Sequence, residues 1–420
     1  MSRFLIYAGA GHGHVYPLAA TADALRRRGH QVVLRAGRGG VETLRGLGFA
    51  AEPIRREVEE REDDSWQART PLGGMRRSVA GCMDRFPYEA ADVRDAVEAE
   101  QPDALLVDNL SWGASAAAEG SGLPWAQAAV FPLPLTTPDA PPFGLGLKPA
   151  RGRAGRIRDA VVRSSALPMF NRLLPSVNAG RARVGVKPIE QLNDVYMTAP
   201  LVVAYTAEPL EYPREHLPAS VRLVGPAVWD PGVSGDAPPW LAEIDRPIVL
   251  VTVSTLFQND AKLIQTTLDA LADEPVVVVA TTASIDPSQF GVPRNARVER
   301  FVPHSLVLPR ATCVVCHGGS GITGKALMEG VPVCVVPFAR DQFEIARRIE
   351  VAGAGARLPA ARLKAGRLRR AVERARGCRG GAERAGQLLR AAGGAEAAAD
   401  ALEGLPVARA DVPPGLRRAR

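Results

Sequence analysis

The sequence has no long apolar run and little material for cross-links. No stretch approaches the roughly 18 apolar residues that a membrane-spanning helix needs, and the start MSRFLIYAGAGHGH lacks the basic region, apolar core and cleavage site of an export signal. The five cysteines are an odd number in a chain without such a signal, so a disulfide framework is not expected. These absences predict a cytoplasmic protein that does not enter a membrane.

Two of the cysteines have a spacing that needs an explanation. Cys313, Cys316 and His317 form C-x-x-C-H, the pattern of c-type haem attachment. That attachment requires export, and here the cysteines lie in ATCVVCH, which has the pattern of a buried strand that ends in a glycine-rich loop. Haem is therefore not expected, and no other spacing of His, Cys, Asp and Glu predicts a metal site.

Lysine is also scarce, with 5 Lys against 47 Arg, although the formal net charge is +7. The positive charge is concentrated near the end, because residues 362–420 contain 14 Lys and Arg against 6 Asp and Glu, while residues 1–361 are close to neutral. This distribution is typical of a solvated helix and a frayed terminus rather than of a phosphate-binding surface. We therefore expect neither nucleic acid nor a membrane among the partners.

The chain is long enough for two domains, with 420 residues of which 46% are apolar and 23% charged. Both halves show alternating strand and helix patterns. In the first half, strand patterns occupy 3–8, 31–36, 104–109 and 124–131, and helix patterns occupy 17–28 and 112–121. In the second half, strand patterns occupy 246–254, 275–282, 311–316 and 331–338, and a helix pattern occupies 260–271. Such alternation predicts parallel sheets flanked by helices.

We therefore predict an α/β fold with two Rossmann-like domains that face each other across a cleft, and a C-terminal helix that crosses back to the first domain. The predicted units are 1–224, a Pro- and Gly-rich linker at 225–240, a second domain at 241–385, and a C-terminal helix with a basic tail at 386–420. Two segments of the first domain, 55–90 and 132–190, look irregular. Long insertions of this kind usually form the walls of a binding site.

A Gly/His segment, AGAGHGHVYP, follows the first strand pattern, at the place where open α/β sheets bind ligands. The segment is a poor dinucleotide fingerprint, because His14 stands where G-x-G-x-x-G has its third glycine. An imidazole at this position can instead act as a general base. Asp108 ends another strand pattern, so the two side chains should meet at one sheet edge, where the carboxylate would orient and stabilise the imidazole. The alternatives are a plain turn around His14 and an Asp108 that caps the following helix.

The second half contains a glycine loop between a strand and a helix, CVVCHGGSGITGKALMEG. Gly319, Gly321 and Gly324 satisfy G-x-G-x-x-G, so a nicotinamide or flavin site is formally allowed. The loop also nearly forms a P-loop, but Ala326 stands where a Ser or Thr would bind magnesium. All these interpretations share backbone N–H groups at a helix start, which predict a phosphate or diphosphate ligand.

The sequence resembles the family 1 nucleotide-sugar glycosyltransferases, especially those of actinobacterial natural-product pathways, in three of their signature segments. These are GHGHVYP near the start, VTVSTLF, and the block FVPHSLVLPRATCVVCHGGSGITGKALMEGVPVCVVPFARDQFE, which contains the glycine loop. The similarity spans nearly the whole chain in order. It implies the GT-B arrangement of two Rossmann-like lobes, with an acceptor site on the first and a nucleotide-sugar site on the second. It also implies inversion of the anomeric centre without a metal.

The resemblance implies a role for each matching residue. His14 would deprotonate the acceptor hydroxyl, with Asp108 as its partner and Gly13 in the acceptor loop. On the donor side, Phe301 would stack on the nucleobase, Val302 and His304 would line base and ribose, Thr255, His317, Gly319, Ser320 and Gly321 would face the diphosphate, and Asp341 and Gln342 would bind the sugar hydroxyls.

We therefore expect an inverting, metal-independent glycosyltransferase. It would move a hexose or deoxyhexose from a dTDP- or UDP-sugar to a hydroxyl or amine of a hydrophobic natural-product acceptor, with no further cofactor. The sequence leaves a homodimer open.

Three residues depart from the family pattern: Lys325 stands where the family often has Glu, Ile322 where it has a hydroxyl residue, and Ser254 where it commonly has Gly. These departures keep a non-catalytic auxiliary protein as an alternative, and G-x-G-x-x-G keeps a dinucleotide-dependent oxidoreductase as another.

Overall fold

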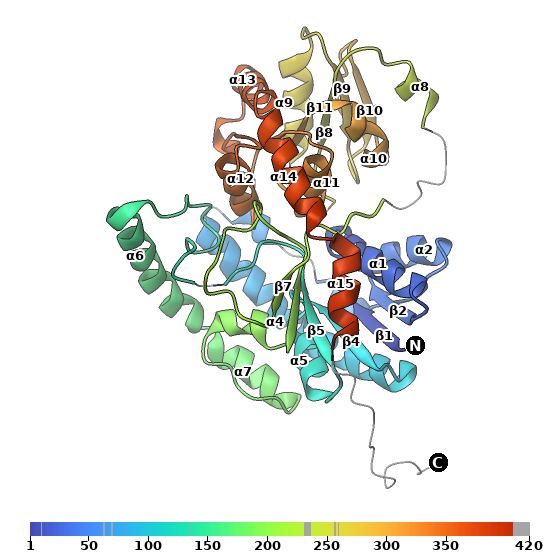
Figure 1. The fold of residues 1–420 in the computed structure, drawn as a ribbon, viewed down its shortest axis with the longest axis vertical. Helices are drawn as coiled ribbons and strands as arrows, with labels where there is room; N and C mark the ends of the chain where they lie inside the picture. Colours follow the sequence, from blue (N-terminus) through green and yellow to red (C-terminus); the bar gives the residue numbers. More distant parts are fainter. Residues whose placement is uncertain are drawn as a thin grey trace.

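The computed structural model describes residues 1–9, 11–61, 64–68, 70–135, 137–230, 237–255, 258 and 260–405. It contains two lobes, each built on a parallel sheet (Figure 1). Part of the predicted linker, 231–236, and the end of the predicted basic tail, 406–420, lie outside the described residues. No helix in the described part of the chain is long and apolar enough to cross a membrane.

The first lobe contains a seven-stranded parallel sheet within these residues, in the order β3-β2-β1-β4-β5-β6-β7. Its strands are β1 (Arg3–Tyr7), β2 (Gln31–Ala36), β3 (Ala50–Pro53), β4 (Ala104–Asp108), β5 (Trp125–Ala129), β6 (Leu201–Ala204) and β7 (Val221–Leu223). Alternate side chains of β1 enter different cores: Phe4 and Ile6 pack in one, and Leu5 and Tyr7 in the other. Burial on both faces explains the unbroken apolar runs in the sequence.

The helices of the first lobe correct two predictions. They are α1 (His12–Arg27), α2 (Arg38–Gly46), α3 (Arg56–Glu59), α4 (Pro71–Glu100), α5 (Trp112–Gly120), α6 (Gly152–Asn171) and α7 (Leu174–Arg183), with short 3-10 turns at Ser65–Gln67 and Leu192–Met197. Segment 55–90 is thus largely helical, and segment 132–190 contains two helices from Gly152 onward. The described residues between 132 and 151 form no helix or strand, as expected. Helix α4 begins where Thr70 Oγ1 accepts a hydrogen bond from Gly73 N and Pro71 occupies the first helical position.

Helix α1 begins at His12 rather than at the predicted Pro17. The carbonyl of Gly11 accepts from the backbone N–H groups of His14 and Val15, at 2.9 and 3.2 Å, so the GHGH segment itself forms the first turn. Pro17 lies inside the helix, where its missing N–H removes a single bond. His14 is therefore held on a helix instead of a loop.

The second lobe contains a six-stranded parallel sheet among the described residues, in the order β10-β9-β8-β11-β12-β13. Its strands are β8 (Ile248–Thr252), β9 (Val277–Thr281), β10 (Ala296–Glu299), β11 (Ala311–Cys316), β12 (Val333–Val335) and β13 (Gly355–Arg357). Its helices are α8 (Pro239–Ala242), α9 (Ala261–Leu271), α10 (His304–Val307), α11 (Ser320–Met328), α12 (Gln342–Val351), α13 (Ala365–Arg376) and α14 (Arg379–Ala391), with short 3-10 turns at Pro287–Gln289, Leu308–Arg310 and Ala360–Arg362. Buried Cys313, Cys316 and Cys334 are free thiols inside these strands, as expected for core residues.

The chain returns to the first lobe at its C-terminal end, as predicted. Helix α14 packs against α11, and α15 (Gly394–Glu403) packs against α1 (Figure 1). Ala398, Ala399 and Leu402 belong to the apolar core of the first lobe. Exposed ion pairs from Arg28 to α15 lie beside this apolar contact.

Candidate active site

A cavity of about 1190 Å³ lies between the two lobes. It is bordered by the carboxyl ends of strands from both sheets, the place where open α/β sheets bind ligands. All the residues predicted for the site line it: Gly13, His14, Asp108, Thr255, Phe301, Val302, His304, His317, Gly319, Ser320, Gly321, Asp341 and Gln342. The structure thus brings the predicted set together, while the roles of its members stay predictions.

His14 and Asp108 form a close pair at the edge of the first sheet. Nδ1 of His14 lies 2.7 Å from Oδ2 of Asp108, and the exposed fractions of the two side chains are 21% and 1%. Because Nδ1 is turned to the carboxylate, Nε2 is the nitrogen left to face a ligand. This is the arrangement that the sequence predicts for a base and its orienting partner.

The backbone around Asp108 fixes that carboxylate. Its Oδ2 accepts from Gly9 N at 3.1 Å and its Oδ1 from Leu110 N at 3.1 Å. A Cβ at Gly9 would come within 2.8 Å of Oδ2, so a glycine is needed for this close approach. Asp108 therefore organises its own loop as well as contacting His14, while the N-cap of the next helix is Ser111.

The pair shifts the pKa of each member. Burial lowers the pKa of His14, but the charge of Asp108 and its hydrogen bond outweigh burial, so the pKa lies above its usual value. Burial raises the pKa of Asp108, yet His14 and the backbone donors bring it below its usual range. The pair thus favours an imidazolium beside a carboxylate, the state that exists after His14 has accepted a proton.

On the second lobe, His317, Gly319 and Ser320 join the end of β11 to the start of α11. Gly319 is the N-cap of α11 and no side chain caps the helix, so its first N–H groups are available to a ligand in the cavity. Among the described residues, Oγ of Ser320 and Nδ1 of His317 have no hydrogen-bond partner. Burial lowers the pKa of His317 to about 4, so its ring is neutral near pH 7.

Gly319 provides a test of this loop. Its backbone has φ −66° and ψ 137°, which alanine adopts readily, but a Cβ there would lie 2.6 Å from Nε2 of His317. We expect Gly319→Ala to displace the ring and to weaken nucleoside diphosphate binding about tenfold, measured by titration calorimetry. Gly366→Ala is the matched control, because a Cβ there meets nothing within 4 Å. Unchanged affinity in Gly319→Ala would show that the ring position does not matter for binding.

The residues predicted for the nucleoside differ in exposure. Phe301 is 61% exposed at the cavity, whereas Val302 is buried in the core and His304 is half-buried. Nε2 of His304 lies 3.1 Å from Oγ1 of Thr281, which donates to Oγ1 of Thr252 at 2.9 Å. Burial lowers the pKa of this histidine to about 4, so it stays neutral.

Asp341 and Gln342 start helix α12 at the second lobe's side of the cavity. Burial raises the pKa of Asp341, and the charge of Asp341 contributes to the raised pKa of His14. Gln342 is engaged with protein: its Oε1 accepts from the N–H groups of Phe338 and Ala339, and its Nε2 donates to Gln258 at 2.7 Å. In this structure Gln342 therefore shapes the loop before α12.

Lys325 contacts the linker instead of the glycine loop. Its Nζ donates to the carbonyl of Trp229 at 3.1 Å and forms an ion pair with Asp230. Burial lowers the pKa of Lys325 to about 8. Trp229 packs edge-on against Tyr16 of the first lobe, so this contact fixes the linker between the lobes.

The first-lobe side of the cavity has an apolar wall, to which the segments 55–90 and 132–190 contribute as the sequence predicts. The wall is formed from α4, from the turn before β6 and from the segment after β5, and it includes Met75, Val79, Phe131, Phe143 and Leu192. The rings of Phe131 and Phe143 are 6.3 Å apart. Met75, Val79 and Phe143 lie in those two segments, whereas Phe131 ends a predicted strand pattern and Leu192 follows the second segment. No signal in the sequence singles out the individual residues. In the described parts of the chain, no group of three or more His, Cys, Asp or Glu could hold a metal ion.

Comparison with known proteins places the chain among glycosyltransferases. Residues 265–400 match the family described as erythromycin biosynthesis protein CIII-like, C-terminal domain. The chain is 33% identical over 386 residues to 4'-demethylrebeccamycin synthase of Lentzea aerocolonigenes, and the match covers 88% of this chain and 91% of the relative.

Solved structures share the fold. Glycosyltransferase VinC in complex with DTDP is 23% identical with a TM-score of 0.67, covering 96% of this chain and 98% of that one. Spinosyn rhamnosyltransferase SpnG complexed with spinosyn aglycone is 20% identical with a TM-score of 0.68, covering 96% and 100%. The expected two-lobed GT-B fold is thereby confirmed.

Proposed function

Because the chain belongs to the family of natural-product glycosyltransferases that includes 4'-demethylrebeccamycin synthase, we propose that it transfers a hexose or deoxyhexose from a dTDP- or UDP-sugar to a hydrophobic acceptor. The transfer would invert the anomeric centre, need no metal, and use a hydroxyl or amine of the acceptor as nucleophile. Membership of this family also decides against the oxidoreductase interpretation of the glycine loop.

One observation supports the proposed chemistry above all others: the His14–Asp108 pair of the first lobe and the start of α11 in the second lobe line the same cavity. Nε2 of His14 takes the proton of the acceptor hydroxyl while the oxygen of that hydroxyl attacks the anomeric carbon of the donor sugar. The new bond forms as the bond from that carbon to the diphosphate oxygen breaks, and the electron pair leaves with the diphosphate. A single displacement of this kind inverts the centre.

The second lobe would stabilise the leaving group. The N–H groups at the start of α11, the Ser320 hydroxyl and the neutral ring of His317 can donate hydrogen bonds to diphosphate oxygens. The developing positive charge on His14 is stabilised by Asp108, whose carboxylate stays ionised. Because these groups act without a metal, we expect an excess of EDTA to leave the rate unchanged.

The nucleoside would bind against Phe301, whose exposed ring lies at the second lobe's side of the cavity. VinC, which has the same fold, was solved with DTDP, and this favours dTDP as the first nucleotide to test. We expect Phe301→Ala to weaken dTDP binding by about tenfold, since stacking on a base contributes roughly 1–3 kcal/mol. Phe290→Ala is the control, because Phe290 packs against an apolar core of the second lobe and is not among the residues that line the cavity. Equal affinities of the Phe301 variant and the wild type would contradict the stacking role.

The acceptor would bind against the apolar wall of the first lobe. The wall suits a large apolar molecule, and His14 lies where a hydroxyl of that molecule could be deprotonated. SpnG, solved with spinosyn aglycone, shares the fold. This supports a hydrophobic aglycone as the acceptor class.

The test has two stages. A thermal-shift panel of dTDP, UDP, GDP and NAD should raise the melting temperature with dTDP or UDP, since a ligand bound only by the folded state stabilises it. The protein is then incubated with the matching nucleotide sugars and a set of hydrophobic aglycones, and the products are identified by mass spectrometry and their anomeric configuration by NMR. Nucleotide binding without transfer to any aglycone would favour the auxiliary-protein alternative, and a retained configuration would contradict the single displacement.

A further inference from the structure

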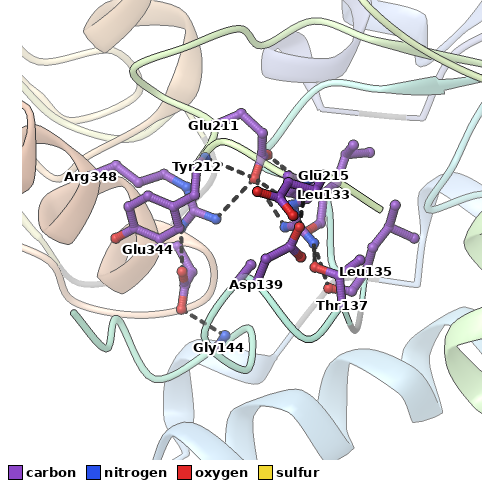
Figure 2. A network of polar contacts seen from close by, with 12 residues as sticks. Leu133, Leu135, Thr137, Asp139, Gly144, Glu211, Tyr212, Glu215, Glu344 and Arg348 are labelled. Carbon is purple, nitrogen blue, oxygen red and sulfur yellow. Dashed lines mark hydrogen bonds and ion pairs between the residues drawn. The ribbon is translucent and has the colours of Figure 1, made fainter. Parts of the chain in front are cut away.

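A buried carboxylate of the second lobe holds a loop of the first. Glu344 on α12 is almost fully buried, and its Oε1 accepts from Gly144 N and Gly146 N, both at 2.8 Å. Figure 2 shows the contact with Gly144. Arg347, three residues further along α12, donates from Nε to the carbonyl of Gly146 at 2.8 Å. The two lobes are thus joined through backbone groups of the wall segment, which we define as residues 131–146, of which residue 136 lies outside the described set.

Glu344 is itself part of a buried charge network (Figure 2). Its Oε2 pairs with Arg348, whose Nη2 lies 3.4 Å from Oε1 of Glu211 on the first lobe. The Arg348 guanidinium also lies over the ring of Tyr212, 4.4 Å from its centre. Burial lowers the pKa of Arg348, but the two carboxylates outweigh it and the pKa is raised. A buried network in which every charge is paired holds a definite geometry, and loss of one member is costly.

The same network holds the other end of the wall segment. Oε2 of Glu211 accepts from Leu133 N at 3.0 Å, and Oε1 of Glu211 lies 3.0 Å from Nη2 of Arg214. Arg214 donates to the carbonyls of Leu133 and Leu135, at 3.2 and 2.9 Å. The Leu133 end is therefore fixed to the first lobe, while the Gly144 end is fixed to α12.

Two glycines allow the wall segment to reach α12. Gly144 and Gly146 have φ of 105° and 56°, which disfavour other residues. A Cβ on Gly146 would come within 2.3 Å of the carbonyl of Phe343, so the segment lies directly against the first turn of α12. That turn follows Asp341, and Phe143 and Gly144 line the cavity on the acceptor side.

We propose that Glu344 is a positioning residue that couples the wall segment to the donor-binding end of α12, so that a nucleotide sugar bound in the second lobe strengthens acceptor binding in the first. This proposal rests on the proposed function. Donor binding at the start of α12 fixes that helix, and Glu344 transmits its position to the amides of Gly144 and Gly146. The wall segment around Phe143 is then held in one conformation, the one that binds the acceptor.

The experiment compares the wild type with Glu344→Gln and Glu344→Ala in the full chain. In Glu344→Ala both amide bonds are lost, and we expect the acceptor KM to rise about tenfold, while kcat and the donor affinity measured without acceptor change less than about threefold. Glu344→Gln retains an oxygen for the two amides but puts an amide NH2 beside Arg348, so its effect should be smaller. Glu119→Gln is the matched control, because Glu119 pairs with Arg181 through both oxygens at 3.0 and 2.9 Å, away from the cavity.

Coupling is then measured directly. Acceptor affinity is determined with and without the nucleotide sugar in the transfer-deficient His14→Ala background, and the ratio should exceed about threefold with Glu344 in place and fall to about one with Glu344→Ala. A variant that is merely less stable would keep the ratio found with Glu344 in place, and this result would overturn the proposal.

Hydrogen exchange gives a readout that needs no transfer. Amides at 144 and 146 should exchange slowly in the wild type, faster in both Glu344 variants, and more slowly on adding the nucleotide sugar only in the wild type. Failure of the wild type to transfer any sugar would overturn the proposed function and leave this measurement intact. Identical exchange in all variants would overturn the role of Glu344.

Discussion

Replacement of His14 by alanine is expected to reduce kcat about a thousandfold, because a positioned general base contributes roughly 10²–10⁴ to the rate. The variant keeps the second-lobe groups that contact the donor, so the affinity for dTDP should stay within about twofold of the wild-type value. Asp108 retains its bonds from Gly9 N and Leu110 N, which keep the loop in place.

The measurement is steady-state transfer with a substrate pair found in the aglycone screen, together with dTDP titration. His216→Ala is the matched control, since His216 is 65% exposed and lies away from the cavity. Undiminished transfer by His14→Ala would remove the basis of the mechanism. A parallel loss of dTDP affinity would instead indicate a general disturbance of the cleft.

The second large effect concerns Asp108→Asn. In the wild type, Asp108 raises the pKa of His14, so the active neutral imidazole is formed as the pH rises through a value above 6.5, the ordinary pKa. Asparagine removes the charge and leaves burial, which lowers the pKa of His14. The acid limb of the pH–rate profile should therefore move to lower pH in the variant.

The plateau of the same profile should fall about a hundredfold, because the weaker base is no longer oriented and its imidazolium is no longer stabilised. The pH dependence of kcat, measured for the wild type and the variant, separates the two effects. Asp103→Asn serves as control, since Oδ2 of Asp103 accepts from Arg3 N at the start of β1, the end of the strand remote from the site. A shift of the acid limb to higher pH in Asp108→Asn would contradict the electrostatic role of Asp108.

The sequence predicted the central strands well because their signal is simple. Strands buried on both faces, such as Ile248–Thr252 and Val277–Thr281, are unbroken runs of largely apolar residues. The short strands Ala50–Pro53, Val221–Leu223 and Gly355–Arg357 contain too few apolar residues to stand out. Such strands exist because a neighbouring strand provides backbone partners, and that information is not local.

Helices at the cleft were predicted less well. Helix α4 contains Gly73, Gly74 and Pro87, which are typical of loops in an isolated sequence. Pro17 gave a start signal for α1 that the structure does not use. Packing against the sheet and against neighbouring helices outweighs these local preferences.

The site itself followed from one rule about parallel sheets. Asp108 ends β4, and His14 lies in the first turn of α1, which follows the adjacent strand β1, so the rule that the carboxyl ends of parallel strands share an edge brings them together. Glu344 had no comparable signal, because its partners are backbone amides about two hundred residues away in a segment without recognisable pattern. Contacts of this kind become visible only in three dimensions.

The return of α15 to the first lobe has a consequence for how the protein is made. Ala398, Ala399, Leu402 and Leu405 complete a core whose other buried residues lie between Phe4 and Ala227. Domains emerging from the ribosome usually fold in order of synthesis, but here the first lobe cannot close its apolar surface until residues 394–405 have been translated. Nascent chains stalled before residue 394 would therefore expose the uncovered side of α1 to chaperones.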